Sequence, residues 1–327
     1  MNEVNICMFG PRGVGKTSLL TTMYEQFEND ISNAKLQLTP DLESASILQE
    51  RLADLKSLFA TDEVFFQAGG LLATENVNIF NFGLGKLGEK PTLKLKFIDF
   101  PGRYLDSNAD KDDKETVNKF VSQSQGVLIA IHAPALMEKQ GKFNDDINRP
   151  MQIADFFKNN YTKDTIKQPR LIILAPIKCE KYIHNNSTDL IDNIKREYKR
   201  LLDLFNSEGL MDKITVVITP VQTTGNIVLG KVEVVKDTKD RNVPQFYFTK
   251  NNSCAVYAPK DSEQPLRYLL RFFLKLHLSS QENCWGIFSF IRTWLGLDKH
   301  LRDAITKFAS ACKRDKFFVV LQCERWL

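Results

Sequence analysis

The chain has 327 residues, of which 43% are hydrophobic, and its formal net charge is only +4. This length supports a large buried core in one or two domains, and the widely spread basic residues exclude a concentrated nucleic-acid-binding surface. No apolar run reaches the ~18 residues that a membrane span needs. Because the first predicted strand begins almost at the initial methionine, we expect no signal peptide. Six cysteines without C-x-x-C spacing indicate free thiols and a cytoplasmic location.

The first predicted element is a strand over 3–9, followed by a glycine-rich turn and a helix near 16–28. The turn, Gly10-Pro-Arg-Gly-Val-Gly-Lys-Thr-Ser18, has the spacing G-x-x-x-x-G-K-[ST], which predicts a loop that binds the phosphates of a nucleotide. Glycines let the backbone N–H groups turn toward an anion, and the helix N-terminus adds positive potential. The lysine brings a charge to the terminal phosphates, and the threonine hydroxyl suits Mg²⁺. The predicted nucleotide-binding residues here are Gly10, Gly13, Val14, Gly15, Lys16, Thr17 and Ser18.

The next elements are a helix over 40–59 and a hairpin, with strands at 75–84 and 91–99 and a turn at 85–90. The second strand ends in Asp99-Phe-Pro-Gly102, a D-x-x-G sequence downstream of the phosphate loop. At the carboxyl end of its strand, Asp99 is expected to hold Mg²⁺ through water, together with Thr17. The backbone N–H of Gly102 is expected to reach the terminal phosphate.

Strands and helices alternate along the rest of residues 1–280. This order predicts an α/β fold with a mostly parallel sheet, one antiparallel edge strand and helices on both faces. The binding loops then lie at the carboxyl ends of the strands. The remaining predicted strands are 126–133, 170–177, 214–219, and 245–249 with 254–258; the remaining helices fall near 114–124, 148–160, 187–206 and 263–278.

Residues 10–18 and 99–102 resemble the first and third motifs of the translation-factor and Ras-related (TRAFAC) class of P-loop GTPases. The resemblance covers residues 1 to about 280. The runs 97–105 and 257–270 further resemble bacterial GTPase domains of the double-GTPase type. The class implies a P-loop NTPase fold, GTP and GDP as ligands, and Mg²⁺ as the cofactor. It also implies a first switch, here a long insertion at about 29–74.

In this class an N/T-K-x-D sequence at the end of a buried strand reads the base. Lys178 matches the lysine, whereas Glu180 replaces the aspartate and Ile177 replaces Asn or Thr. A carboxylate can accept hydrogen bonds from both N1–H and the 2-amino group of guanine. We therefore predict guanine as the base, and adenine or no base selection stays open. The segment 216–225 follows where the class has a fifth, S-A-K-like loop.

The resemblance also implies a switch threonine just before the hairpin strand, for which Thr74 is best placed and Thr61 is second. Either hydroxyl can equally serve a loop or a cap. Ras-like proteins have Gln directly after D-x-x-G, where this chain has Arg103, and many have Gly where it has Arg12. Two interpretations stay open for Arg12: it acts in cis near the terminal phosphate, or its side chain turns to solvent or obstructs a partner's arginine. The role of Arg103 stays open as well. Because arginine only donates hydrogen bonds, we expect slow intrinsic hydrolysis that self-association or a partner accelerates. The polar loop 106–115 is the predicted second switch. The candidate catalytic residues are Lys16, Arg12, Arg103 and Thr74.

Residues 281–327 form an aromatic-rich C-terminal extension that is predicted to be mostly helical, with a short strand at 317–321. Trp285, Phe288, Ile291 and Leu295 can share one helical face. Three interpretations stay open for this extension: packing on the core, a partner-binding helix, or peripheral membrane contact through 284–297. Among the histidines, His132 is expected to be a core residue, and only His184 is placed near a base edge.

These observations predict a GTP-binding, slowly GTP-hydrolysing molecular switch that regulates a protein effector or acts through self-association. An ATP-hydrolysing P-loop enzyme is the first alternative. A nucleotide-locked scaffold without turnover is the second. No nucleic-acid partner is expected.

Overall fold

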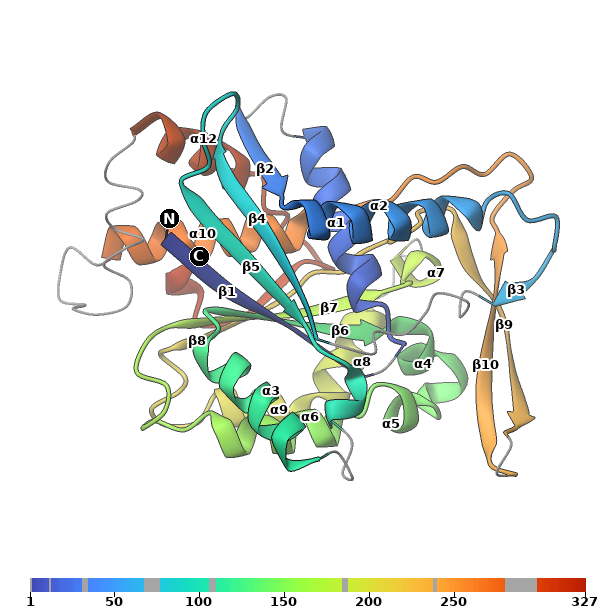
Figure 1. The fold of residues 1–327 in the computed structure, drawn as a ribbon. Coiled ribbons are helices and arrows are strands. Elements are labelled where there is room, and N and C mark those ends of the chain that lie inside the picture. The colour runs from blue at the N-terminus through green and yellow to red at the C-terminus, as the bar shows by residue number, and fades with distance from the viewer. Residues whose placement is uncertain are drawn as a thin grey trace.

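The computed structural model describes residues 2–11, 13–30, 35–67, 77–105, 110–183, 188–237, 240–279 and 299–327. Its centre is an eight-stranded sheet with the strand order β11-β8-β7-β6-β1-β5-β4-β2 and helices on both faces (Figure 1). The five strands β8, β7, β6, β1 and β5 are parallel, β4 and β2 extend one edge in antiparallel pairs, and β11 is antiparallel at the other. The strands are β1 Asn2–Phe9, β2 Leu36–Pro40, β4 Asn78–Lys86, β5 Leu93–Asp99, β6 Gly126–His132, β7 Arg170–Ile177, β8 Ile214–Ile218 and β11 Val319–Gln322.

Both faces of the central strands are buried, which explains their nearly continuous apolar sequences. In β1, Val4, Ile6 and Met8 face one core, while Cys7 and Phe9 face the other. The same alternation of side chains runs through β7. The two cores therefore lie on opposite faces of one sheet, and each needs its own layer of helices.

Helices cover both faces of the sheet (Figure 1). The first core is closed by α1 Lys16–Asp30, α2 Leu42–Ser57, α10 Gln264–Ser279 and α12 Lys299–Ser310. The second core is closed by α3 Lys111–Gln123, α6 Pro150–Asn160, α8 Asp189–Glu197 and α9 Lys199–Phe205. Shorter helices lie in the connections: α4 Ala133–Met137, α5 Asn144–Ile147, α7 Glu180–Ile183, and the 3-10 turns η3 Gly102–Leu105, η4 Glu138–Gly141 and η5 Glu324–Trp326.

A small antiparallel sheet stands at the side of this body (Figure 1). It consists of β3 Phe66–Gln67, β10 Asn242–Lys250 and β9 Ile227–Lys236, in that order. Its apolar face contains Phe66, Ile227, Leu229 and Phe248. The Lys250 ammonium donates to the carbonyl oxygens of Phe59 (2.9 Å) and Thr61 (2.7 Å), which attaches β10 to the segment after α2.

The predicted fold class is confirmed, because the sheet is mostly parallel, has an antiparallel edge and carries helices on both faces. Two element predictions are wrong. Residues 254–258 form no strand, and the helix expected over 187–206 divides at Tyr198 into α8 and α9. Strands β2, β3 and β9 were not predicted. Of these, β2 lies in the segment 29–74 and pairs with β4.

The described part of the C-terminal extension packs on the main sheet. Leu301, Ile305 and Phe308 of α12 belong to the first core, and Phe317 and Phe318 belong to the second. The aromatic segment 284–297, with its predicted helical face, lies outside the described residues. Its partner-binding and membrane interpretations, and the domain boundary at 280, stay predictions. None of the described helices is long and apolar enough to cross a bilayer.

Candidate functional site

The predicted binding loops gather at the carboxyl edge of the main sheet. Strand β1 pairs with β5 on one side and with β6 on the other. The register of β1 and β5 sets Met8 opposite Asp99, so the acidic strand end lies beside the start of the phosphate loop. Strand β7 ends next to β6 and carries the Lys178–Glu180 sequence into this edge. One edge therefore brings together segments that are far apart in the chain.

The phosphate loop joins β1 directly to the N-terminus of α1, as predicted. Gly10, Gly13 and Gly15 all have positive φ (145°, 73° and 114°). At Gly15 an added Cβ would lie 2.7 Å from Cδ1 of Ile177, so a side chain there would require Ile177 to shift. Ile177 thus packs under the loop at the position where the resembling class has Asn or Thr. A loop of this shape presents N–H groups to an anion at the positive end of a helix.

Lys16, Thr17 and Asp99 form a buried polar cluster at the mouth of this loop. The Lys16 ammonium lies 3.6 Å from Oδ1 of Asp99 and donates to the Gly10 carbonyl oxygen (3.1 Å). The Thr17 hydroxyl donates to Oδ2 of Asp99 at 2.6 Å. The Asp99 side chain has no exposed area, and Lys16 is 5% exposed. A buried carboxylate needs such partners, because an uncompensated charge is expensive to bury.

This cluster suits Mg²⁺ better than a metal that needs a complete protein cage. Among the residues that the structure describes, no three His, Cys, Asp or Glu side chains come together as a ligand set. Mg²⁺ typically keeps several waters and takes one or two protein oxygens plus phosphate oxygens. Thr17 and Asp99 offer those two oxygen atoms beside the phosphate loop. They are the residues that would hold the ion.

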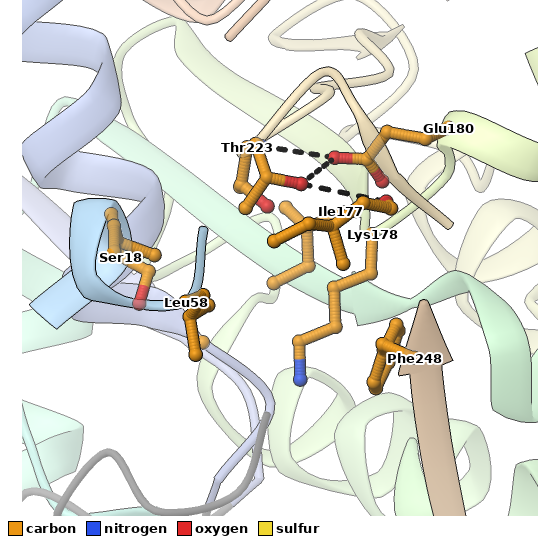
Figure 2. Close-up of a pocket in the computed structure, with 11 residues that line it drawn as sticks. Ser18, Leu58, Ile177, Lys178, Glu180, Thr223 and Phe248 are labelled. Carbon is orange, nitrogen blue, oxygen red and sulfur yellow. Dashed lines mark hydrogen bonds between the residues drawn. The ribbon is translucent and has the colours of Figure 1, made fainter. Parts of the chain in front are cut away.

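A mostly apolar pocket adjoins the phosphate loop (Figure 2). The walls come from α1, the end of α2, the end of β7, the loop after β8, and the small sheet. The lining residues are Gly15, Ser18, Leu55, Leu58, Ile177, Lys178, Glu180, Thr223, Thr224, Ile227 and Phe248.

Lys178 enters this pocket from a strained backbone position at the end of β7. Its φ is 53°, which is uncommon for a residue with a side chain. Its ammonium lies 5.5 Å from the centre of the Phe248 ring (Figure 2). Burial lowers the pKa of Lys178 to about 8, although the nearby Glu180 carboxylate acts in the opposite direction.

The Lys178 pKa predicts a pH dependence of stability. A lysine whose pKa is lower in the folded state makes folding less favourable while it is charged, and this penalty is relieved as pH rises through about 8 toward the ~10.4 of the unfolded chain. Between pH 7 and pH 10, the wild type should gain free energy of unfolding relative to Lys178→Met, as measured by urea denaturation. Lys158→Met, at an exposed position of α6, is the control and should follow the wild-type profile. Parallel profiles for all three proteins would contradict the assignment.

Glu180 is almost fully buried and is held by the loop that follows β8. Its Oε1 atom accepts from the backbone N–H of Thr224 (3.0 Å), the Thr224 hydroxyl (3.0 Å) and the backbone N–H of Gly225 (3.3 Å). Burial raises the pKa of Glu180, while these hydrogen bonds act to lower it. The predicted base-reading carboxylate and the predicted fifth loop are therefore in direct contact.

His132 has a structural role at the same edge of the sheet. Its Nδ1 accepts from the backbone N–H of Ala135 at the start of α4, and its ring lies 4.7 Å from that of Phe246. Burial, and then the charge of Lys178, hold the pKa of His132 well below its usual range. The neutral imidazole thus caps a helix, as expected of a core histidine.

Of the remaining predicted site residues, some lie among the described residues and others do not. Arg103 follows Gly102 in η3, is exposed, and has its guanidinium 5.7 Å from the centre of the Tyr104 ring. The Thr61 hydroxyl accepts from the backbone N–H of Glu63, which is the loop role considered for it. Three site predictions lie outside the described residues: Arg12, Thr74 and His184. The segment 106–109 of the predicted second switch does too, whereas its residues 111–115 form the start of α3 and not a loop.

Sequence reasoning missed the apolar walls of the pocket. Leu55 and Leu58 come from the end of α2, whereas Ile227 and Phe248 come from the small sheet. The β-branched run in 227–236, followed by polar turn residues, is a strand-and-turn signal that could have indicated the hairpin. No local signal places Phe248 against Lys178, because that contact depends on how the small sheet packs.

No protein-family model and no curated protein matches this chain. Among solved structures, it is similar to a protein described as nucleolar GTP-binding protein 1 of Plasmodium falciparum. The identity is 16%, the match covers 68% of this chain and 78% of that one, and the TM-score is 0.31.

The chain is also similar to the GTPase-like domain of Saccharomyces cerevisiae Ski7, described as bound to GDP and inorganic phosphate. The identity is 13%, the match covers 67% of this chain and 43% of that one, and the TM-score is 0.33. Both neighbours are described as GTP-binding or GTPase-like proteins.

Proposed function

We propose that this chain binds magnesium-chelated GTP, hydrolyses it slowly, and acts as a switch for a protein partner. The observation that carries the proposal is that the phosphate loop has the Lys16–Thr17–Asp99 cluster at its mouth and adjoins an apolar pocket that contains Lys178. A nucleoside triphosphate has an anionic end that needs N–H groups and cations, and a flat aromatic end that needs apolar walls. The two halves of the site match these two ends.

The phosphate half of the site would act through charge. The N–H groups of the loop and the N-terminus of α1 would bind phosphate oxygens, and Lys16 would move from the Gly10 carbonyl to the terminal phosphates. Mg²⁺ bound at Thr17 and Asp99 would neutralise charge that develops on the transferred phosphoryl group. In such reactions the protein contributes chiefly by positioning and electrostatic stabilisation.

Slow turnover is proposed from the residue that follows Gly102. A group that orients the attacking water must accept a hydrogen bond from it, and a guanidinium has donors only. Arg103 is exposed in η3, next to Tyr104, so its side chain is accessible to a second protein surface. We therefore expect hydrolysis to accelerate on self-association or on binding a partner, in line with the large effects of a well-placed arginine.

A switch is energetically feasible with few contacts. Moving a segment from 1:99 to 99:1 requires ~5.5 kcal/mol of differential binding. Hydrogen bonds to charged groups contribute ~1.5–3 kcal/mol each. Gly102 begins η3 after Phe100 and Pro101, close in the chain to the Asp99 that ends β5, and its backbone N–H would respond to the terminal phosphate. Two or three such contacts would be enough.

The nucleotide that copurifies with the protein tests the proposal. After denaturation of the purified protein and chromatography of the released ligand, we expect GDP, and rebinding of GTP that EDTA abolishes. Intact GTP would indicate a locked scaffold, and ADP would indicate an ATP hydrolase. The GTPase rate per molecule should also rise with protein concentration or with a partner. A fast rate that is independent of concentration would contradict the need for a second protein surface.

A further inference from the structure

The carboxylate of Glu180 is engaged by its own protein. Its Oε1 atom accepts three hydrogen bonds, two from Thr224 and one from Gly225, and the side chain is 1% exposed. Figure 2 shows the carboxylate directed at the loop that contains Thr223, while Lys178 extends into the pocket. Hydrogen bonds to a charged acceptor are among the stronger ones in proteins. Glu180 therefore holds this loop firmly.

The loop that Glu180 holds forms one wall of the pocket and is also hydrogen-bonded to the segment 258–260. Thr223 and Thr224 line the pocket. The Thr224 carbonyl oxygen accepts from the backbone N–H of Ala258 at 3.1 Å, and Gln222 exchanges two backbone hydrogen bonds with Lys260 (3.0 and 2.9 Å). The loop is thus clamped between Glu180 on one side and the segment 258–260 on the other.

This geometry does not suit direct reading of guanine by Glu180. Guanine presents two donors on one edge, N1–H and the 2-amino group, and a carboxylate that reads both must use both oxygens. With Oε1 occupied by three donors, pairing with both groups would require giving up contacts to the loop. Breaking them would leave buried N–H groups of the loop unsatisfied, which is costly.

We propose that Glu180 is a positioning residue that sets the Thr223–Gly225 loop against the nucleobase, and that it does not read the base edge itself. The inference rests on the proposed nucleotide binding. It assigns base contact to the loop and to the apolar walls of the pocket. Loss of Glu180 then weakens every purine nucleotide by the same factor, because the displaced loop borders the base regardless of its 2-substituent.

Two substitutions at Glu180 distinguish positioning from reading, with affinities for GTP, ATP and xanthosine triphosphate measured by calorimetry. In Glu180→Gln the amide oxygen can still accept from the loop, so this variant should stay within about 3-fold of wild type for all three ligands. Glu180→Ala removes the acceptor and should weaken all three by roughly 10-fold. If Glu180 read the base, the Glu180→Gln substitution would change the preference between bases. The new amide N–H₂ would face the donors of guanine and weaken GTP, and it would donate to the 2-carbonyl of xanthine and strengthen xanthosine triphosphate. A marked loss for GTP with a gain for xanthosine triphosphate would overturn the inference.

A second measurement needs no nucleotide. In the nucleotide-free protein, Glu180→Ala should accelerate hydrogen exchange at the amides of Thr224 and Gly225, and Glu180→Gln should do so much less. Glu208→Gln, an exposed carboxylate on another surface, is the matched control and should leave exchange and affinities unchanged. Unchanged exchange in Glu180→Ala would overturn the positioning role. If instead the wild type binds none of the three triphosphates, the proposed function itself fails, and that result is distinct from a change in base preference.

Discussion

Replacement of Lys16 by alanine is expected to lower the affinity for magnesium-GTP by roughly 10- to 150-fold, since a charge-assisted hydrogen bond contributes ~1.5–3 kcal/mol. Lys16 carries a positive charge at the mouth of the phosphate loop, and it is held within 3.6 Å of Asp99. The loop amides remain in the variant, so binding should be weakened and not abolished at high ligand concentration. Isothermal titration calorimetry with GTP in the presence of Mg²⁺ measures the effect.

A matched control separates loss of this charge from a general change in net charge. Lys94→Ala removes a half-buried lysine that pairs with Glu3, away from the phosphate loop, and should leave GTP affinity unchanged. Because Lys16 also faces a buried carboxylate, thermal unfolding of Lys16→Ala must be followed in parallel. Unaltered affinity in a folded Lys16→Ala protein would refute the proposed phosphate site.

The phosphate loop is the part of the site that sequence defines best, and the reason is that it is local. Nine consecutive residues, 10–18, form the turn and the start of α1 directly after β1, so conformation and chemistry come from one segment. Asp99 was also predictable, because parallel strands present their carboxyl ends at one edge, and its strand lies next to β1. Its separation of 82 residues from Thr17 in the chain did not matter.

The base pocket could be predicted only in part, because it depends on packing between distant segments. The sequence identifies Lys178 and Glu180 as a pair near the base. It does not indicate that the carboxylate faces the loop 44 residues further on, a contact set by the register of β7 and β8. The aromatic wall is harder still to predict from the sequence, because Phe248 reaches Lys178 only through the packing of the small sheet.

The two wrong secondary-structure predictions also arise from packing between distant segments. The strand predicted at 254–258 has apolar residues in suitable positions, but its backbone pairs with the loop after β8 only at single positions, such as the Thr224–Ala258 hydrogen bond. The division of the helix at Tyr198 lets its buried side chain enter the second core together with Leu201. In both places tertiary packing overrides local propensity.

Gly225→Ala is expected to cost the most stability among single changes at this loop, about 3–5 kcal/mol of the free energy of unfolding. Gly225 has φ of 75°, which disfavours any side chain, and an added Cβ would lie 1.7 Å from the Ala258 carbonyl oxygen. The overlap is with backbone, so a rotamer change cannot relieve it. The loop must move, which breaks the Thr224–Ala258 hydrogen bond and the Gly225–Glu180 hydrogen bond. Urea denaturation at constant pH measures the loss.

Gly88→Ala is the control that isolates the steric part of this loss. Gly88 has a similar φ of 82°, but an added Cβ would meet no atom within 4 Å. Gly88→Ala should therefore lower the free energy of unfolding only by the cost of a left-handed backbone conformation for alanine, ~1–2 kcal/mol. The difference between the two variants measures how rigidly the segment 258–260 holds the loop against the pocket. Equal losses would mean that the loop yields easily, and a yielding loop could not transmit the position of Glu180 to a bound base.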